Sequence, residues 1–97
     1  MPIYIIRVEL HGSERKDYEK LHTSMELEGY LTYITLDSGE KYKLPDAEYV
    51  FSTEKYIDIQ KIAESTKKIA DAINDNSGIL VTKVEKLGQK GLQAVTD

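Results

Sequence analysis

Residues 2 to 12 carry the sequence Pro2-Ile-Tyr-Ile-Ile-Arg-Val-Glu-Leu-His-Gly12, which alternates in the manner of a β-strand. Successive side chains of a strand point to opposite faces of its sheet. One face is apolar throughout and predicts a core, with Tyr4, Ile6, Val8 and Leu10. The other face mixes apolar and charged side chains, Ile3, Ile5, Arg7 and Glu9. We therefore predict a strand that buries one face only.

A polar corner and an amphipathic helix follow this strand. His11 and Gly12 form the corner, and Ser13 is a suitable N-cap because its hydroxyl can accept from an amide of the first helical turn. The helix presents one stripe at spacing i, i+3, i+4, i+7, formed by Tyr18, Leu21, His22 and Met25. Gly29 is expected to end the helix.

The remaining elements follow from similar patterns. Residues 30–36 are rich in β-branched and aromatic residues, 41–44 form a short strand or hairpin arm, and 47–52 alternate as the main third strand. Residues 59–73 have the period of a second amphipathic helix, capped by Thr53 or Asp58, and 79–84 form the last strand. The predicted class is α+β, a ferredoxin-like βαββαβ domain with two helices on one face of an antiparallel sheet and the other face open.

Length and composition limit the function classes. Ninety-seven residues suit one domain, here residues 1–84, with 85–97 either a tail or a weak extra strand. The net charge of −4 opposes broad nucleic-acid coating but permits transient contact with RNA. The chain has no cysteine, no apolar run long enough for a membrane span or signal peptide, and no cofactor or metal motif. We expect a cytoplasmic protein without cofactor or membrane contact.

Four polar residues near the first strand and helix are candidates for catalysis: Arg7, Glu9, His11 and His22. Arg7 would hold a phosphate, Glu9 or His11 would move protons, and His22 would orient or relay. Such a set suffices for metal-free RNA cleavage, in which the 2′-hydroxyl is the nucleophile. Each residue also has a structural alternative: half-buried packing for His22, a turn for His11, and a surface ion pair for Arg7 and Glu9.

An open, partly apolar sheet face usually finds a partner, so we expect a homodimer formed through the sheet or an edge strand. In such a dimer the Glu9 carboxylates of two subunits could instead hold Mg²⁺, which makes a metal-dependent nuclease a further alternative.

Three segments resemble the GhoS family of small bacterial antitoxins: Tyr4-Ile-Ile-Arg-Val-Glu-Leu-His-Gly12, Asp17-Tyr-Glu-Lys-Leu-His-Thr-Ser-Met25 and Tyr42-Lys-Leu-Pro-Asp-Ala-Glu-Tyr49. The likeness extends from residue 2 to about residue 84. It implies a ferredoxin-like fold and an endoribonuclease of a type V toxin-antitoxin system that cleaves the messenger of a membrane-lytic toxin. Glu9 would match an acidic residue of that family, whereas His22 stands where an arginine is expected.

Two functions therefore remain open on the sequence. The first is a metal-independent, RNA-acting endoribonuclease antitoxin. The second is a non-catalytic dimeric module that binds a protein partner through its open sheet face.

Overall fold

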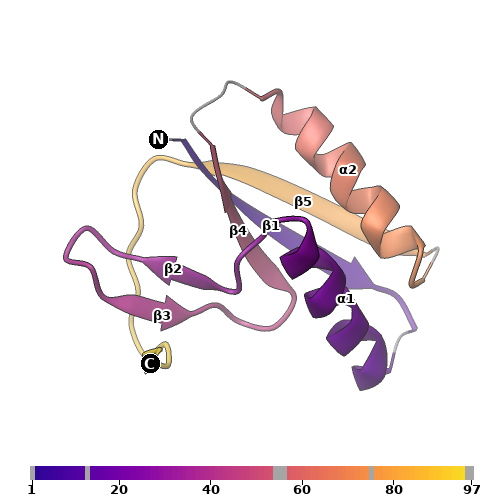
Figure 1. Cartoon of the computed structure of the whole chain (residues 1–97), viewed down its shortest axis with the longest axis horizontal. Coiled ribbons are helices and arrows are strands. Elements are labelled where there is room, and N and C mark those ends of the chain that lie inside the picture. The colour runs from indigo at the N-terminus through magenta and orange to yellow at the C-terminus, as the bar shows by residue number, and fades with distance from the viewer. Residues whose placement is uncertain (1, 13, 54–56, 75, 96–97) are drawn as a thin grey trace.

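The computed structural model describes residues 2–12, 14–53, 57–74 and 76–95. Its elements follow the order β-α-β-β-β-α-β (Figure 1). They are β1 (Ile3–Leu10), α1 (Arg15–Leu27), β2 (Tyr33–Thr35), β3 (Lys41–Lys43), β4 (Glu48–Ser52), α2 (Ile59–Asp71) and β5 (Ser77–Val84). The α+β class is confirmed, but there is one strand more than in the predicted βαββαβ order.

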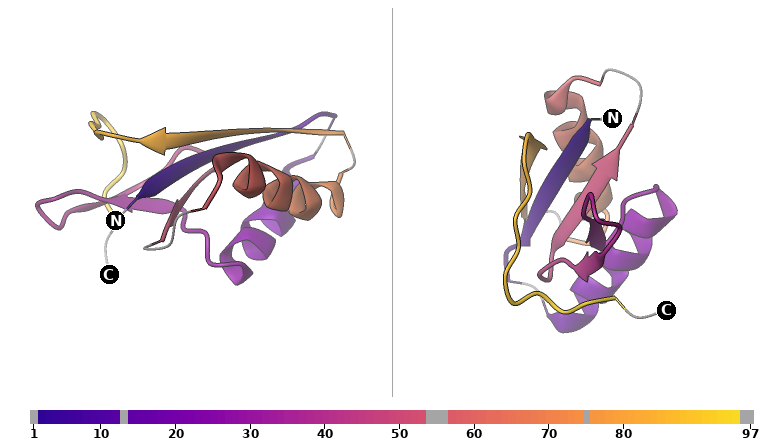
Figure 2. Two further views of the ribbon diagram at one scale, coloured as in Figure 1. Left: turned by 90° about the horizontal axis from the view of Figure 1, so that it is seen from above. Right: turned by 90° about the vertical axis from the view of Figure 1, so that its left-hand side faces the viewer.

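A three-stranded sheet with the order β4-β1-β5 forms the centre of the molecule, and β1 pairs antiparallel with both neighbours. Both helices lie on the same face of this sheet (Figure 2). The predicted alternation of β1 is confirmed, because Tyr4, Ile6, Val8 and Leu10 are all buried on that face. They form one core with helix residues that include Leu21, Met25, Ile62 and Ala70.

The segment between α1 and β4 differs from the prediction. Residues 30–36 do not form one long strand, because only Tyr33–Thr35 pairs with Lys41–Lys43, in a separate two-stranded sheet. A single bridge between Leu31 and Val50 connects this region to β4. The hairpin projects to one side of the central sheet (Figure 1).

The second face of the central sheet is only partly open. Ile3 and Ile5 contact a second apolar cluster centred on Ile34, Leu44 and Val50. Leu87 and Leu92 of the C-terminal segment belong to the same cluster. The expectation of an entirely open face is therefore wrong at this end, where the hairpin and the tail cover it.

The C-terminal segment returns along β3 within the same chain. The Lys43 amide donates to the Gln93 carbonyl at 2.8 Å, and the Val95 amide donates to the Lys41 carbonyl at 3.0 Å. A bridge joins Tyr42 and Ala94. The tail thus adds a short strand-like contact to the hairpin.

Local capping agrees with the sequence at the start of α2 and at the end of α1. Asp58 caps α2, because its side chain accepts from the Gln60 amide at 2.8 Å. Gly29 follows α1 with a φ of 91°, which suits a glycine after a helix end. The predicted cap Ser13 lies outside the described residues; α1 begins after Glu14, whose amide donates to the Asp17 carboxylate at 3.2 Å.

Candidate functional site

A groove of about 700 Å³ lies beside the last residues of β1, which extend past the first residue of β4 and have no strand on that side. The Val8 amide there donates to the Ala47 carbonyl at 3.0 Å, outside the regular ladder. The Leu10 amide donates to the Tyr18 hydroxyl at 3.2 Å. The loop before β4 and helix α1 therefore replace a strand along this edge of β1, and the groove forms between them.

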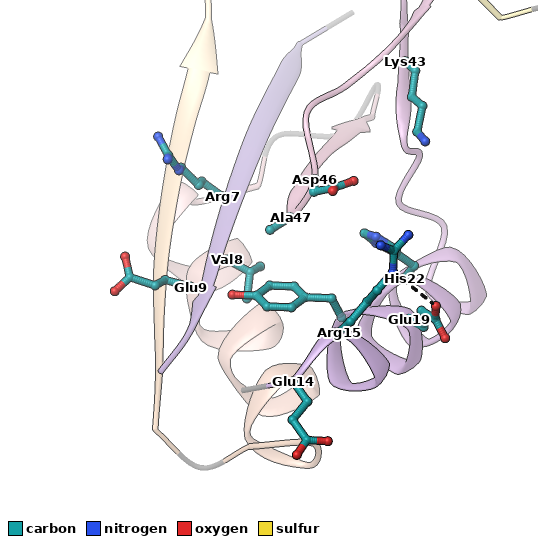
Figure 3. Close-up of a pocket in the computed structure, with 11 residues that line it drawn as sticks. Arg7, Val8, Glu9, Glu14, Arg15, Glu19, His22, Lys43, Asp46 and Ala47 are labelled. Atoms are coloured by element: carbon teal, nitrogen blue, oxygen red, sulfur yellow. Dashed lines mark ion pairs between the residues drawn. The ribbon is translucent and has the colours of Figure 1, made fainter. Parts of the chain in front are cut away.

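Residues from β1, from α1 and from the segment before β4 line this groove. Figure 3 shows Arg7 and Glu9 on one side of β1, pointing away from the helix, with Arg15 and His22 of α1 on the other side. This arrangement follows from the strand period, because Arg7 and Glu9 alternate with the buried Val8.

Glu9 and His11 form a direct contact at the end of β1. The His11 Nδ1 atom lies 3.0 Å from a Glu9 carboxylate oxygen, and both side chains are largely exposed. The backbone of His11 is held by the loop before β5: its amide donates to the Asn76 carbonyl and its carbonyl accepts from the Asn74 side chain, each at 3.0 Å. These two hydrogen bonds fix the backbone of His11, while its imidazole ring stays accessible to solvent.

The position of the His11 ring is also defined by β5. Gly78 pairs with Glu9 in the β1–β5 register, and a Cβ atom built on Gly78 would lie 4.0 Å from the His11 Nε2 atom. The ring therefore lies beside Gly78, on the side of the sheet where Glu9 projects.

Arg7 occupies the same open face two residues earlier. Its register neighbours are Glu48 on β4 and Leu80 on β5. Residues i and i+2 of a strand are about 7 Å apart along it, so Arg7 and the Glu9–His11 pair can contact one extended ligand. The Arg7–Glu9 surface ion pair considered from the sequence is not among the ion pairs of the described residues.

His22 lies on the other side of the sheet from these three residues. Its Nδ1 atom is 2.5 Å from the Tyr49 hydroxyl, and the two rings meet edge to face with centroids 5.5 Å apart. Tyr49 is fully buried. Burial, with the nearby charges of Glu26 and Asp46, raises the pKa of Tyr49 above its ordinary value of 10.0. The hydroxyl therefore stays protonated at neutral pH.

The four predicted site residues are thus divided into two groups. Arg7, Glu9 and His11 share the open face of the sheet, whereas His22 contacts the core through Tyr49 and borders the groove from α1. Arg7, Glu9 and His22 border one groove, and His11 contacts Glu9, but His22 reaches the groove from the opposite side of β1. The sequence pattern did not distinguish these two sides.

Several groove residues were not identified from the sequence. Lys43, Asp46 and Ala47 come from the segment before β4 and reach β1 only through the tertiary fold. Ala47 has a φ of 67°, the one positive φ of a non-glycine residue in the described chain. The sequence offered one signal, Pro45, which interrupts strand pairing just before this loop.

Among the residues that the structure describes, no group of three or more His, Asp or Glu side chains is placed to hold a metal ion. Within the same residues, no helix has the length and apolar character needed to cross a membrane. No protein-family model matches the chain, and no curated protein sequence is significantly similar to it.

Proposed function

We propose that the chain is a metal-independent endoribonuclease of the GhoS antitoxin type that acts on RNA in the cytoplasm. The observation that carries this proposal is the Glu9–His11 contact of 3.0 Å on an accessible surface that also presents Arg7. A carboxylate on Nδ1 of an imidazole favours the tautomer whose Nε2 atom is free to accept a proton.

The proposed reaction uses these three residues in turn. The His11 Nε2 atom removes the proton of a ribose 2′-hydroxyl, and the oxygen attacks the adjacent phosphorus. The bond from phosphorus to the 5′-oxygen breaks, and this oxygen receives a proton from the imidazolium. Arg7 binds the phosphate oxygens, on which negative charge increases in the transition state. The products are a 2′,3′-cyclic phosphate and a free 5′-hydroxyl.

The fold is compatible with this class. We propose that the chain is a ferredoxin-like variant in which β3 is an addition to the hairpin. Two observations support this: both neighbours of β1 are antiparallel to it, and the Leu31–Val50 bridge puts the residues before β2 beside β4. His22 would then act from the groove, as an orienting or relaying group, or have only a structural role.

A second candidate function is a non-catalytic module that binds a protein partner through the open part of the sheet. The observation that favours it is Leu80, which is 63% exposed directly beside Arg7. Leu80 adds apolar surface to the part of the sheet that the hairpin and the tail leave uncovered, and a protein partner could bury it.

The test is cleavage of a mixed pool of unstructured RNA by the purified protein in excess chelator. Loss of a general acid-base residue typically reduces rates by about 10² to 10⁴. We expect losses of this order for His11→Asn and a clear loss for Arg7→Ala and Glu9→Gln. The matched control is Arg15→Ala, which removes an exposed arginine on the helix side of β1. Circular dichroism checks the folding of each variant.

The outcomes separate the alternatives. Cleavage in chelator that requires Arg7, Glu9 and His11 but not Arg15 supports the proposal, and so does a cyclic phosphate end. Cleavage only with added Mg²⁺ favours the metal-dependent alternative based on Glu9. If RNA remains intact under both conditions, the nuclease proposal is wrong and the interaction module remains.

A further inference from the structure

The outer edge of β5 has no partner strand in the described part of the chain. β5 covers Ser77–Val84 and pairs with β1 along one edge only, because the sheet order is β4-β1-β5. It contains eight residues, no proline, and a single charge, Lys83. Long edge strands are usually protected by charges, prolines or a covering segment, and an edge without these features is suited to pair with another strand.

The backbone groups along this edge can be assigned from the alternation of the ladder. The amides of Val8 and Leu10 face the β4 side of β1, so the backbone groups of Arg7 and Glu9, which alternate with them, point toward β5. Leu80, the partner of Arg7, therefore directs its backbone groups inward. The amides and carbonyls of its neighbours Ile79 and Val81 consequently face outward.

The side chains of β5 are self-complementary about Leu80. With a twofold axis at this residue, Leu80 lies opposite its own copy on the open face. On the helix face Ile79 lies opposite Val81 of the partner subunit, and Val81 opposite Ile79 of the partner subunit. At the end of the overlap Ser77 meets Lys83 of the partner subunit, so apolar residues pair with apolar ones and polar with polar.

The helix face also has space for this pairing. A groove of about 500 Å³ runs between α2 and β5 and is lined by Ala63, Lys67 and Ile79 among others. Lys67 donates to the Ser77 carbonyl at 2.6 Å and pairs with Asp71 at 3.0 Å, so its charge lies at the beginning of the edge rather than at its centre. The centre of the groove can accept Val81 of the partner subunit.

We propose that two copies of this chain pair through antiparallel β5 strands about a twofold axis at Leu80. The two three-stranded sheets then form one continuous sheet, and the two Leu80 side chains, each 63% exposed in the single chain, contact each other on the open face. The occupant of this edge is a second copy because, in this register, Leu80 meets Leu80 and Ile79 meets Val81, so the sequence of β5 matches itself around the axis. The dimer does not depend on nuclease activity.

The pairing has a geometric consequence for the open face. Arg7 is opposite Leu80 within each subunit. In the dimer one row therefore crosses the sheet, in the order Arg7, Leu80, Leu80 of the partner subunit and Arg7 of the partner subunit. Three strand spacings separate the two arginines, about 14 Å. A dimer would therefore present two copies of the Arg7, Glu9 and His11 surface to one side.

The first experiment is sedimentation velocity of the full chain over a range of concentrations. We expect a dimer that Leu80→Lys converts to a monomer, since two lysines would face each other at the axis. The matched control is Leu27→Lys, because Leu27 is 82% exposed at the end of α1 and far from the axis. A monomeric parent at about 100 µM, or equal effects of the two substitutions, would overturn the proposal.

The second experiment tests the register by cross-linking, which a chain without cysteine allows. In the proposed pairing Leu80 is a non-hydrogen-bonded pair with Cα atoms about 4.5 Å apart, within the range that a disulfide bridges. Leu80→Cys should therefore form a covalent dimer under mild oxidation. Thr82→Cys should not, since the two positions are offset by four residues, about 13 Å. Equal cross-linking of both variants, or none with Leu80→Cys, contradicts this interface.

Discussion

The Nδ1 atom of His22 lies 2.5 Å from the hydroxyl oxygen of the fully buried Tyr49, so helix α1 and strand β4 share one polar contact at the edge of the core. Because the raised pKa of Tyr49 keeps its hydroxyl protonated, this hydroxyl can donate to His22. The contact connects α1 to β4 directly behind the groove.

Tyr49→Phe removes this hydrogen bond and should lower the free energy of unfolding by about 1 to 2 kcal/mol at neutral pH. The pH dependence has a defined sign. Burial raises the pKa of Tyr49 in the folded chain, so its contribution is complete below the unfolded value of 10.0 and is lost as the pH rises above it. Urea unfolding at pH 7 and pH 11 should show a smaller alkaline loss for Tyr49→Phe than for the parent. Tyr33→Phe, at a half-exposed position of β2, is the control and should retain the parental loss.

His22→Asn tests whether His22 takes part in cleavage. The asparagine amide can replace Nδ1 as acceptor for Tyr49, so the fold should be kept. If His11 and Glu9 move the protons, cleavage in chelator should stay within about threefold of the parent, whereas loss of a general base costs on the order of 10² to 10⁴. A folded His22→Asn protein that loses cleavage as His11→Asn does would assign His22 the relay role.

The sequence was sufficient for the parts of the fold that depend on local periodicity. Alternation identified the buried face of β1, and the 3.6-residue period identified Leu21 and Met25 as core residues of α1. The divided segment 30–44 could not be obtained in this way, because strands of three residues carry little pattern and their pairing depends on distant residues. The same holds for the tail, whose contacts to β3 are set by the whole chain.

The candidate site shows the same limit. Arg7, Glu9 and His11 were correctly grouped because one strand and its corner place them, whereas His22 was separated from them by the thickness of the sheet. The groove depends on the loop before β4 passing beside β1, and no local pattern specifies that contact.

Leu92→Ala tests the contribution of the C-terminal segment to stability. Leu92 packs against the second apolar cluster with Ile3 and Ile5, so its truncation should lower the free energy of unfolding by about 1 to 3 kcal/mol. Leu27→Ala is the control, because Leu27 is 82% exposed, and it should change stability by less than about 0.5 kcal/mol. Chemical denaturation measures both, and equal effects would mean that the tail is not part of the folded unit.

Asp71→Asn tests acid stability at the junction of α2 and β5. The Lys67 ammonium and the Ser77 hydroxyl hold the pKa of the Asp71 carboxyl below its ordinary value of 3.8. A lowered pKa contributes stability above the unfolded value, and this contribution is lost as the pH falls through the folded value. Thermal unfolding between pH 6 and pH 2 should therefore show a smaller acid loss for Asp71→Asn than for the parent. An unchanged slope would show that the pair is not maintained in solution.

Ala47→Gly tests whether the loop that forms the groove is strained. Ala47 has a φ of 67°, a left-handed conformation that glycine adopts without steric cost, and its carbonyl accepts from Val8 at 3.0 Å. Because the substitution keeps this hydrogen bond and relieves the conformation, we expect stabilisation of about 0.5 to 1 kcal/mol. Ala63→Gly within α2 is the matched control and should destabilise by about 0.5 to 1 kcal/mol. Opposite signs in urea unfolding would confirm strain at Ala47, and equal destabilisation would exclude it.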